Sequence, residues 1–227
     1  MTIKGIQKVT LLDYPGRVAC TIFTGGCNFR CPFCQNSSLV IQTDNHYLPE
    51  EEVIEFLKTR QNKLDAVCIS GGEPLIQKDI LEFIKKIKEL GFLVKLDTNG
   101  SFPEKLSELL EEHLLDYVAM DIKNIMAKYP ETSGVKTDTT KIQKSIELLK
   151  NSHIEHEFRT TVVKDFHTKE DMLEIARLTN PSPLYFQQFR DSSSVIKEGL
   201  QGYSDLEIKG LVEEISKSFK NVSLRGV

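Results

Sequence analysis

The sequence predicts an α/β fold in which parallel strands form an open, partial (β/α)6 barrel. Three observations carry this prediction. Short apolar or β-branched runs that end in glycine or polar residues occur six times along the 227 residues, amphipathic stretches with helical spacing separate them, and the connections are long enough for βαβ units, which build parallel sheets. A chain of this length suits one core, so we expect a single domain that covers residues 1–227.

Each of the six predicted strands is a short run rich in apolar and β-branched residues. The runs cover residues 18–24, 66–70, 93–98, 117–121, 157–163 and 184–189. Apolar residues at helical spacing mark the helices between and after them: Val53, Phe56 and Leu57; Ile80, Ile84 and Ile87; Leu106, Leu109 and Leu110; Ile142, Ile146 and Leu149; Met172, Ile175 and Ala176; Ile208, Leu211, Val212 and Ile215. Pro49 before three glutamates predicts the start of the first helix, because proline and acidic side chains both favour a first turn.

Two predicted connections are longer than the fold requires. They cover residues 123–140 and 190–204, and they contain proline, glycine and many hydroxyl side chains. Long loops in compact domains are often functional, so we expect both segments to be polar and mobile and to form a lid or a surface for a partner.

Composition excludes several classes of function. The net charge is −4, and 40% of the residues are hydrophobic and 27% charged, as in an ordinary globular protein. No basic surface for nucleic acid is indicated, since Lys85, Lys86 and Lys88 share their predicted helix with acidic residues. No apolar run reaches the ~18 residues of a membrane helix, and no signal-peptide core follows Met1. We expect a cytoplasmic protein with reduced thiols, in which clustered cysteines indicate metal binding or catalysis.

Three cysteines lie close together, at Cys27, Cys31 and Cys34, with C-x3-C-x2-C spacing. Structural zinc sites and 4Fe–4S clusters both normally take four protein ligands. Three thiolates therefore indicate a cluster with one iron left open to a substrate or cofactor. The alternative is a zinc site completed by His46. No ligand spacing relates the other histidines, which we expect at the surface or in loops: His113, His153, His156 and His167.

The two remaining cysteines, Cys20 and Cys68, lie inside predicted strands. Free cysteine packs as a small hydrophobe, so we expect both in the core. The alternative for Cys20 is a spare thiol beside the cluster. Gly25 and Gly26, just before the first clustered cysteine, leave room for its loop.

The cysteine motif resembles that of the radical S-adenosylmethionine (radical SAM) superfamily, with Phe33 as the aromatic residue before the third cysteine. Four more motifs accompany it at residues 13–17, 70–74, 97–100 and 121–123, and they read Asp-Tyr-Pro-Gly-Arg, Ser-Gly-Gly-Glu-Pro, Asp-Thr-Asn-Gly and Asp-Ile-Lys. This ordered set resembles the glycyl-radical-enzyme activating enzymes, and most closely the activating protein of anaerobic ribonucleoside-triphosphate reductase. The likeness runs from near the start of the chain to its end.

The resemblance implies a radical SAM fold and a chemistry based on cofactors. One 4Fe–4S cluster on the three cysteines would bind S-adenosylmethionine (SAM) through its amino and carboxylate groups and cleave it to a 5′-deoxyadenosyl radical. The radical would take a hydrogen atom from one glycine of a larger glycyl radical enzyme, with anaerobic ribonucleotide reductase as the favoured partner and flavodoxin or ferredoxin as reductant. No side-chain acid or base catalysis is implied. No second cysteine-rich insertion occurs, which indicates one cluster.

The motifs fall where a parallel barrel binds ligands, beyond the carboxyl ends of its strands. Gly71 and Gly72 open a strand end so that backbone groups can approach the SAM amino group, and Glu73 orients this loop or the amino group. Lys123 is the matching candidate for pairing with the SAM carboxylate. The cofactor-binding residues that the resemblance implies are Phe33, Gly71, Gly72, Glu73, Pro74, Asp97, Asn99, Lys123 and Arg159.

Asp97, Thr98 and Asp121 offer oxygen ligands at neighbouring strand ends. Two carboxylates beside a SAM carboxylate repel one another unless a cation compensates them. The resemblance therefore implies a monovalent cation at these three residues. The alternative is that the aspartates cap strand ends.

Three other residues leave alternatives open. Arg159 in a predicted strand needs an anionic or carbonyl partner, which is SAM, an incoming glycyl peptide, or an internal carboxylate of Glu157 or Asp121. Strand alternation turns only one of Gln187 and Gln188 inward, and the sequence does not say which.

One residue departs from the family pattern, because Gln35 follows the third cysteine where many relatives have histidine. The departure leaves the cluster ligands intact but puts in doubt a proton or hydrogen-bonding role at that position, and with it the subfamily. Rival functions are activation of another glycyl radical enzyme of the pyruvate formate-lyase type and modification of a small molecule such as a deazapurine precursor. A third rival is a non-enzymatic zinc or iron–sulfur binding module.

Overall fold

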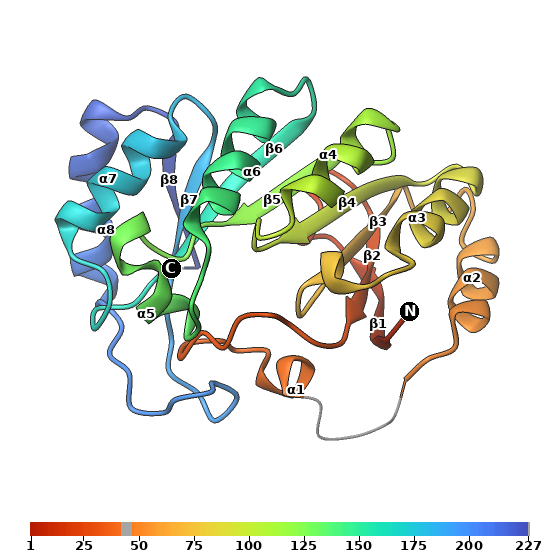
Figure 1. Ribbon diagram of the computed structural model, residues 1–227, viewed down its shortest axis with the longest axis horizontal. Coiled ribbons are helices and arrows are strands. Elements are labelled where there is room, and N and C mark those ends of the chain that lie inside the picture. Colours follow the sequence, from red (N-terminus) through yellow and green to blue (C-terminus); the bar gives the residue numbers. More distant parts are fainter. Residues whose placement is uncertain (42–46, 227) are drawn as a thin grey trace.

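The computed structural model describes residues 1–41 and 47–226, and eight strands of this part form one sheet in the order β1-β2-β3-β4-β5-β6-β7-β8. The strands are Ile3–Thr10 (β1), Ala19–Thr24 (β2), Ala66–Gly71 (β3), Leu93–Thr98 (β4), Tyr117–Asp121 (β5), Glu155–Val162 (β6), Leu184–Gln188 (β7) and Val222–Arg225 (β8). They follow an arc whose two outer strands do not pair with each other (Figure 1). The sheet is therefore an open barrel.

All neighbouring strands from β2 to β8 pair in parallel. Ile22 of β2, for example, lies opposite Ile69 of β3. The six predicted strands and the open parallel barrel are confirmed, with strand bounds that shift by one or two residues. Cys20 and Cys68 are fully buried within β2 and β3, as predicted for core residues.

Neither outer strand belongs to the six predicted from the sequence. β1 pairs antiparallel with β2 and places Ile6 opposite Ile22, and β8 pairs with β7 over four residues. Each has a partner on one side only. An edge strand that is partly exposed needs less apolar sequence than a strand covered on both faces, so β1 mixes lysine and glutamine with isoleucine.

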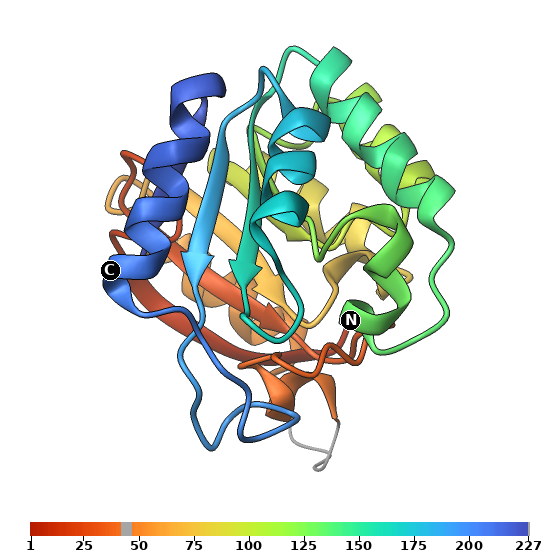
Figure 2. The ribbon, with the colours of Figure 1, turned by 90° about the vertical axis from the view of Figure 1, so that its left-hand side faces the viewer.

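Helices cover the outer, convex side of the sheet (Figure 1). The six predicted helices are confirmed as Glu50–Lys58 (α2), Ile80–Glu89 (α3), Pro103–Glu111 (α4), Thr139–Asn151 (α6), Lys169–Thr179 (α7) and Asp205–Ser218 (α8). Pro49 directly precedes α2, and Phe83, Leu106 and Ile146 are among the helix residues buried in the core. Figure 2 looks onto α7 and α8, with β7 between them. No helix within the described residues is long and apolar enough to cross a membrane.

The two long connections differ from their prediction as open, polar loops. Residues 123–140 contain the short helices Met126–Lys128 (η2) and Tyr129–Ser133 (α5), and they bury four side chains, Asn124, Tyr129, Thr132 and Ser133. Residues 190–204 form no helix or strand apart from one bridge between Gly202 and Val163, and they bury Val195 and Leu200. The first segment is therefore part of the packed structure rather than a lid.

Candidate functional site

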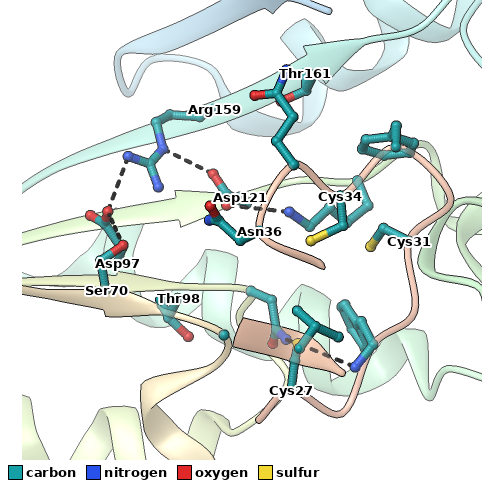
Figure 3. Close-up of a pocket in the computed structure, with 18 of the residues that line it drawn as sticks. Cys27, Cys31, Cys34, Asn36, Ser70, Asp97, Thr98, Asp121, Arg159 and Thr161 are labelled. Carbon is teal, nitrogen blue, oxygen red and sulfur yellow. Dashed lines mark hydrogen bonds and ion pairs between the residues drawn. The ribbon is translucent and has the colours of Figure 1, made fainter. Parts of the chain in front are cut away.

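A pocket of about 480 Å³ lies at the carboxyl ends of the parallel strands. Its lining comprises Asp13, Cys27, Phe29, Cys31, Phe33, Cys34, Gln35, Asn36, Val40, Ser70, Gly71, Gly72, Asp97, Thr98, Asn99, Asp121, Lys123, Arg159, Thr161 and Gln187. Most residues singled out by their motifs thus face one space, although they come from six different strands or strand ends (Figure 3).

The three clustered cysteines follow β2 and face this pocket from one loop (Figure 3). Cys31 is 6% exposed, and Cys27 and Cys34 are half-buried. Burial raises the pKa of the Cys27 thiol to about 11 and that of Cys31 to about 12, so a metal must displace protons when it binds. Among the described residues, no three His, Cys, Asp or Glu side chains are already gathered into a metal-binding group, so the three thiols face the pocket without meeting at one point. His46, the candidate fourth ligand for zinc, lies outside the described residues.

Two glycine positions let other segments approach the cysteine loop closely. A Cβ at Gly72 would lie 1.9 Å from the carbonyl oxygen of Gly26. Gly134, which ends α5, has a φ of +69°, and a Cβ there would lie 2.1 Å from the carbonyl oxygen of Arg30. Larger side chains at either glycine would displace the loop. The end of β3 and the α5 segment therefore brace the loop that carries the cysteines.

Asp97 and Asp121 lie on either side of Arg159 in the pocket (Figure 3). Arg159 Nη1 lies 3.5 Å from Asp97 Oδ2, and Nε donates to Asp121 Oδ1 at 2.9 Å. Lys123 adds an ion pair to Asp121 at 3.2 Å, and Lys95 pairs with Asp97. Burial by itself would raise the pKa of Asp121, but Arg159 and Lys123 lower it to about 2. The internal ion pair, one of the alternatives left open for Arg159, is the one observed.

This network bears on the monovalent cation expected at Asp97, Thr98 and Asp121. That expectation assumed uncompensated carboxylates, whereas three cationic side chains already pair with them. The Thr98 hydroxyl is also engaged, because it donates to Glu73 at 2.9 Å and accepts from the Gly100 N–H at 3.1 Å. The three cations already offset much of the repulsion between the carboxylates, and the monovalent cation stays a prediction.

Glu73 and Pro74 lie behind the pocket wall rather than on its surface. The Glu73 carboxylate is fully buried and accepts three hydrogen bonds, from Leu75 N–H (3.0 Å), Thr98 Oγ1 (2.9 Å) and Asn99 N–H (2.7 Å). These bonds tie the end of β3 to the end of β4. Glu73 thus holds the wall in place, which is the loop-orienting alternative expected from the sequence. Burial raises its pKa to about 7.

Replacing Glu73 with glutamine is expected to flatten the pH dependence of stability. The folded-state pKa of about 7 exceeds the ordinary value of 4.5, so the folded protein binds this proton more tightly than the unfolded chain. The resulting stabilisation is complete below pH ~4.5 and is lost as pH rises through ~7, by roughly 3 kcal/mol. Urea unfolding between about pH 5 and 8 measures this slope. The exposed Glu89→Gln variant is the control, and equal slopes in wild type and Glu73→Gln would contradict the expectation.

The structure also places residues whose orientation the sequence left open. Gln187 lines the pocket, whereas Gln188 Nε2 donates to Asp205 Oδ1 at 2.8 Å, away from it. Gln35 Nε2 donates to the carbonyl oxygen of Arg190 at 3.1 Å. The residue that stands where many relatives have histidine therefore links the cysteine loop to the second long connection.

His156 departs from the expected surface or loop setting, and His167 lies in a loop as expected but is not at the surface. His156 lies in β6, and His167, although in a loop, is fully buried. His167 Nε2 lies 2.8 Å from the Lys123 carbonyl oxygen, and its ring packs against Phe33 with centroids 6.2 Å apart. His167 thereby positions two pocket residues. Ligand spacing could not reveal this role, because His167 acts through a backbone carbonyl and a ring contact.

Lys95 is a further side chain of the charge network that the motifs did not reveal. It is 2% exposed, pairs with Asp97 and lies 5.9 Å from the centroid of the Tyr117 ring. Lys95 and Asp97 are two positions apart in β4, and strand alternation turns such residues to the same face. That alternation is a sequence signal that could have found the pair.

Comparison with known families decides the assignment, because the family model described as "Radical SAM superfamily" matches residues 21–179. The chain belongs to the radical SAM superfamily. Membership implies a 4Fe–4S cluster and SAM as cofactors. The pocket fits them, because three thiols face it from one loop and thiolates are the usual ligands of iron–sulfur clusters.

Two kinds of curated relative resemble this radical SAM chain. "Putative glycyl-radical enzyme activating enzyme MJ1227" of Methanocaldococcus jannaschii is 36% identical over 235 residues, which cover 99% of this chain and 96% of the relative. A GTP 3′,8-cyclase of Helicobacter pylori is 27% identical over 203 residues, which cover 84% of this chain and 61% of the relative. The first likeness extends over both proteins, and the second leaves more than a third of the relative unmatched.

Solved structures share the fold. Streptococcus suis SuiB bound to S-adenosylmethionine matches with a TM-score of 0.73 at 17% identity, over 88% of this radical SAM chain and 48% of SuiB. The chain thus spans about half the length of SuiB. A domain of pyruvate-formate lyase-activating enzyme from Bacteroides vulgatus matches with a TM-score of 0.56 at 14% identity, over 71% of this chain and 99% of that domain.

Proposed function

We propose that this radical SAM protein is an activating enzyme that installs a glycyl radical on a larger enzyme in the cytoplasm, with anaerobic ribonucleoside-triphosphate reductase as the favoured target. The observation that carries the proposal is one pocket that joins the three thiols to the charged strand ends. The relative named as a glycyl-radical enzyme activating enzyme supports this class of activity, since it matches 99% of the chain. The choice of target rests on the ordered motifs from Asp13 to Lys123.

We assign Cys27, Cys31 and Cys34 as the ligands of one 4Fe–4S cluster. When bound, the cluster and SAM supply a one-electron cleavage that produces a 5′-deoxyadenosyl radical. The chain itself contributes placement and exclusion of water. The pocket volume of about 480 Å³ lies within the range of ~300–1,000 Å³ common for ligand sites.

We assign different residues of the pocket to different groups of SAM. Gly71 and Gly72 bring bare backbone to the pocket wall, and we assign them to the amino group. Lys123 is our candidate partner for the carboxylate. Burial lowers the pKa of Lys123, but Asp121 raises it more, to a value above the ordinary one, so this side chain stays cationic. Arg159 offsets the negative charges of Asp97 and Asp121 in the same pocket.

The second long connection borders the site and is our candidate contact surface for the partner enzyme. Its Lys197 N–H donates to the Pro32 carbonyl oxygen at 2.9 Å, and Gln35 bonds to its first residue, Arg190. A partner that rests on residues 190–204 would therefore lie against the cysteine loop. We propose flavodoxin or ferredoxin as the source of the electron.

Deuterium transfer is the decisive test of this proposal. The reconstituted protein, dithionite, SAM and an anaerobic ribonucleotide reductase labelled with α-deuterated glycine should give a glycyl radical in electron paramagnetic resonance and deuterium in 5′-deoxyadenosine. Flavodoxin or ferredoxin with its reductase should replace dithionite. The Cys31→Ala protein is the negative control. SAM cleavage without deuterium transfer from any glycyl radical enzyme of the same organism would overturn the activase assignment.

A small-molecule substrate is the second candidate, because GTP 3′,8-cyclases match 84% of the chain. The two candidate functions predict different results in the assay of SAM cleavage. A nucleotide such as GTP should then accelerate SAM cleavage without a partner protein, and mass spectrometry should detect a modified nucleotide. Neither effect is expected of an activating enzyme.

A further inference from the structure

Cys27 differs from the other two clustered cysteines in the groups that face its sulfur. The Phe29 N–H donates to Cys27 Sγ at 3.3 Å, and Asn99 Nδ2 reaches the same sulfur at 3.8 Å. Among the described residues, no other hydrogen bond reaches any of the three sulfurs. Asn99 directly follows Thr98, the last residue of β4. Figure 3 shows Thr98 and Cys27 on one side of the pocket, across from Cys31 and Cys34.

Two neighbouring residues, Ser101 and Asn28, fix the orientation of the Asn99 amide. Its Oδ1 accepts from Ser101 N–H (3.0 Å) and from Ser101 Oγ (2.5 Å), and its Nδ2 donates to Asn28 Oδ1 at 2.9 Å. Asn28 Nδ2 closes the ring by donating to Ser101 Oγ at 2.9 Å. With Oδ1 occupied by two donors, the flipped amide would set like groups against each other. The second N–H of Asn99 therefore points to Cys27.

The amide is also shielded from water and anchored through its backbone. Asn99 is 5% exposed and Ser101 8% exposed, and the Asn99 N–H donates to the buried Glu73 carboxylate at 2.7 Å. A hydrogen bond in a dry site is electrostatically stronger than one in water. The geometry is thus held by three neighbours before any cofactor binds.

Cys31 differs from Cys27 in the group that most opposes the effect of its burial. Burial raises the pKa of Cys31, and Lys123 is the strongest opposing influence on it. Lys123 lowers the pKa of both Cys31 and Cys27, whereas the N–H donors from Phe29 and Asn99 reach the sulfur of Cys27. Burial, and to a smaller extent the Glu73 carboxylate, raise the pKa of Cys27, and the Phe29 N–H opposes them.

We propose that Asn99, oriented by Asn28 and Ser101, is a positioning residue that raises the reduction potential of the cluster through its N–H bond to the Cys27 thiolate. Reduction adds one electron from an external donor to the cluster, and part of that charge spreads onto the thiolates. An N–H donor stabilises the reduced form more than the oxidised form, and hydrogen bonds to sulfur are among the factors that set these potentials. This inference rests on the proposed function only in taking Cys27 as a cluster ligand.

The test is a redox titration of the reconstituted protein, with mediator dyes and dithionite, followed by electron paramagnetic resonance of the reduced cluster. Asn99→Leu removes the donor without adding charge. We expect the ratio of reduced to oxidised cluster at a fixed potential to fall about three- to tenfold, which is a shift of up to ~59 mV to more negative potential for one electron. Ser101→Ala keeps the N–H but loosens it, so a smaller shift in the same direction is expected.

Gln187→Leu is the matched control, because Gln187 also places a side-chain amide in the pocket. Within the described residues, that amide makes no hydrogen bond to a cysteine sulfur. The potential of this variant should equal that of the wild type. An unchanged potential in Asn99→Leu, or equal shifts in Asn99→Leu and Gln187→Leu, would overturn the inference. If Asn99→Leu fails to take up a cluster, the absence of any shift in Ser101→Ala overturns it instead. Failure of the wild type to assemble a cluster would count against the proposed function, so the two failures are distinguishable.

Discussion

Replacing Cys27, Cys31 or Cys34 with alanine is expected to abolish the visible iron–sulfur absorbance of the reconstituted protein and all cleavage of SAM. The three thiols face one pocket from one loop, and the cluster has no spare protein ligand when only three are present. Loss of one thiolate leaves two, which cannot retain the four irons. Absorbance spectra and assay of 5′-deoxyadenosine under anaerobic conditions measure the two effects.

Cys20→Ala and Cys68→Ala are the matched controls for this experiment. Both thiols are fully buried in strands and lie outside the pocket lining. We expect the cluster and SAM cleavage to persist, with a packing loss of roughly 1 kcal/mol in the free energy of unfolding. Retention of the cluster in Cys31→Ala, or its loss in Cys20→Ala, would contradict the ligand assignment.

Replacing Arg159 with leucine is expected to lower the free energy of unfolding of the apoprotein by roughly 3 kcal/mol. The Arg159 side chain is 14% exposed and pairs with both Asp97 and Asp121. Its removal leaves two largely buried carboxylates, each with one remaining lysine partner. Urea unfolding near neutral pH measures the loss. Asp121→Asn in the same protein should restore part of it, because one uncompensated charge disappears.

The surface provides a control for the Arg159 variant. Arg190 and Asp205 are 64% and 54% exposed and lie 3.6 Å apart, so Arg190→Leu should cost less than about 1 kcal/mol. Acid unfolding adds a second criterion. Because Asp121 has a pKa of about 2 against an ordinary 3.8, it stabilises the fold above pH ~3.8 and loses this contribution as pH falls through ~2. In Arg159→Leu, the free energy of unfolding should therefore fall less on acidification than in the wild type. Equal losses of unfolding free energy in Arg159→Leu and Arg190→Leu would contradict the buried network.

The cluster loop and the strand-end motifs could be predicted from the sequence because their signals are local. Cys27, Cys31 and Cys34 lie within eight positions of one another, and each strand is a continuous apolar run. Parallel strands bring their carboxyl ends to one edge, so motifs at those ends meet whatever the details of packing. The pocket lining agrees with this expectation for most of the motif residues.

Glu73 shows where local reasoning ends. Its place in the Gly-Gly-Glu-Pro motif suggested a cofactor contact, yet its carboxylate is buried against the end of β4. The bonding partners, Thr98 and Asn99, lie 25 and 26 residues further along the chain. A motif specifies which residues occur together, but the direction of a side chain at a strand end depends on the neighbouring strand.

The sequence by itself determined the alternation of strands and helices, the three-cysteine loop and the edge of the sheet at which the site lies, because each depends on residues close together in the chain. Only the tertiary structure decided how charges and hydrogen bonds are shared between strands. Arg159 balances two aspartates 38 and 62 residues away, and Asn99 reaches the sulfur of Cys27 across 72 residues. Such contacts depend on strand register and side-chain rotamers, which no local pattern specifies.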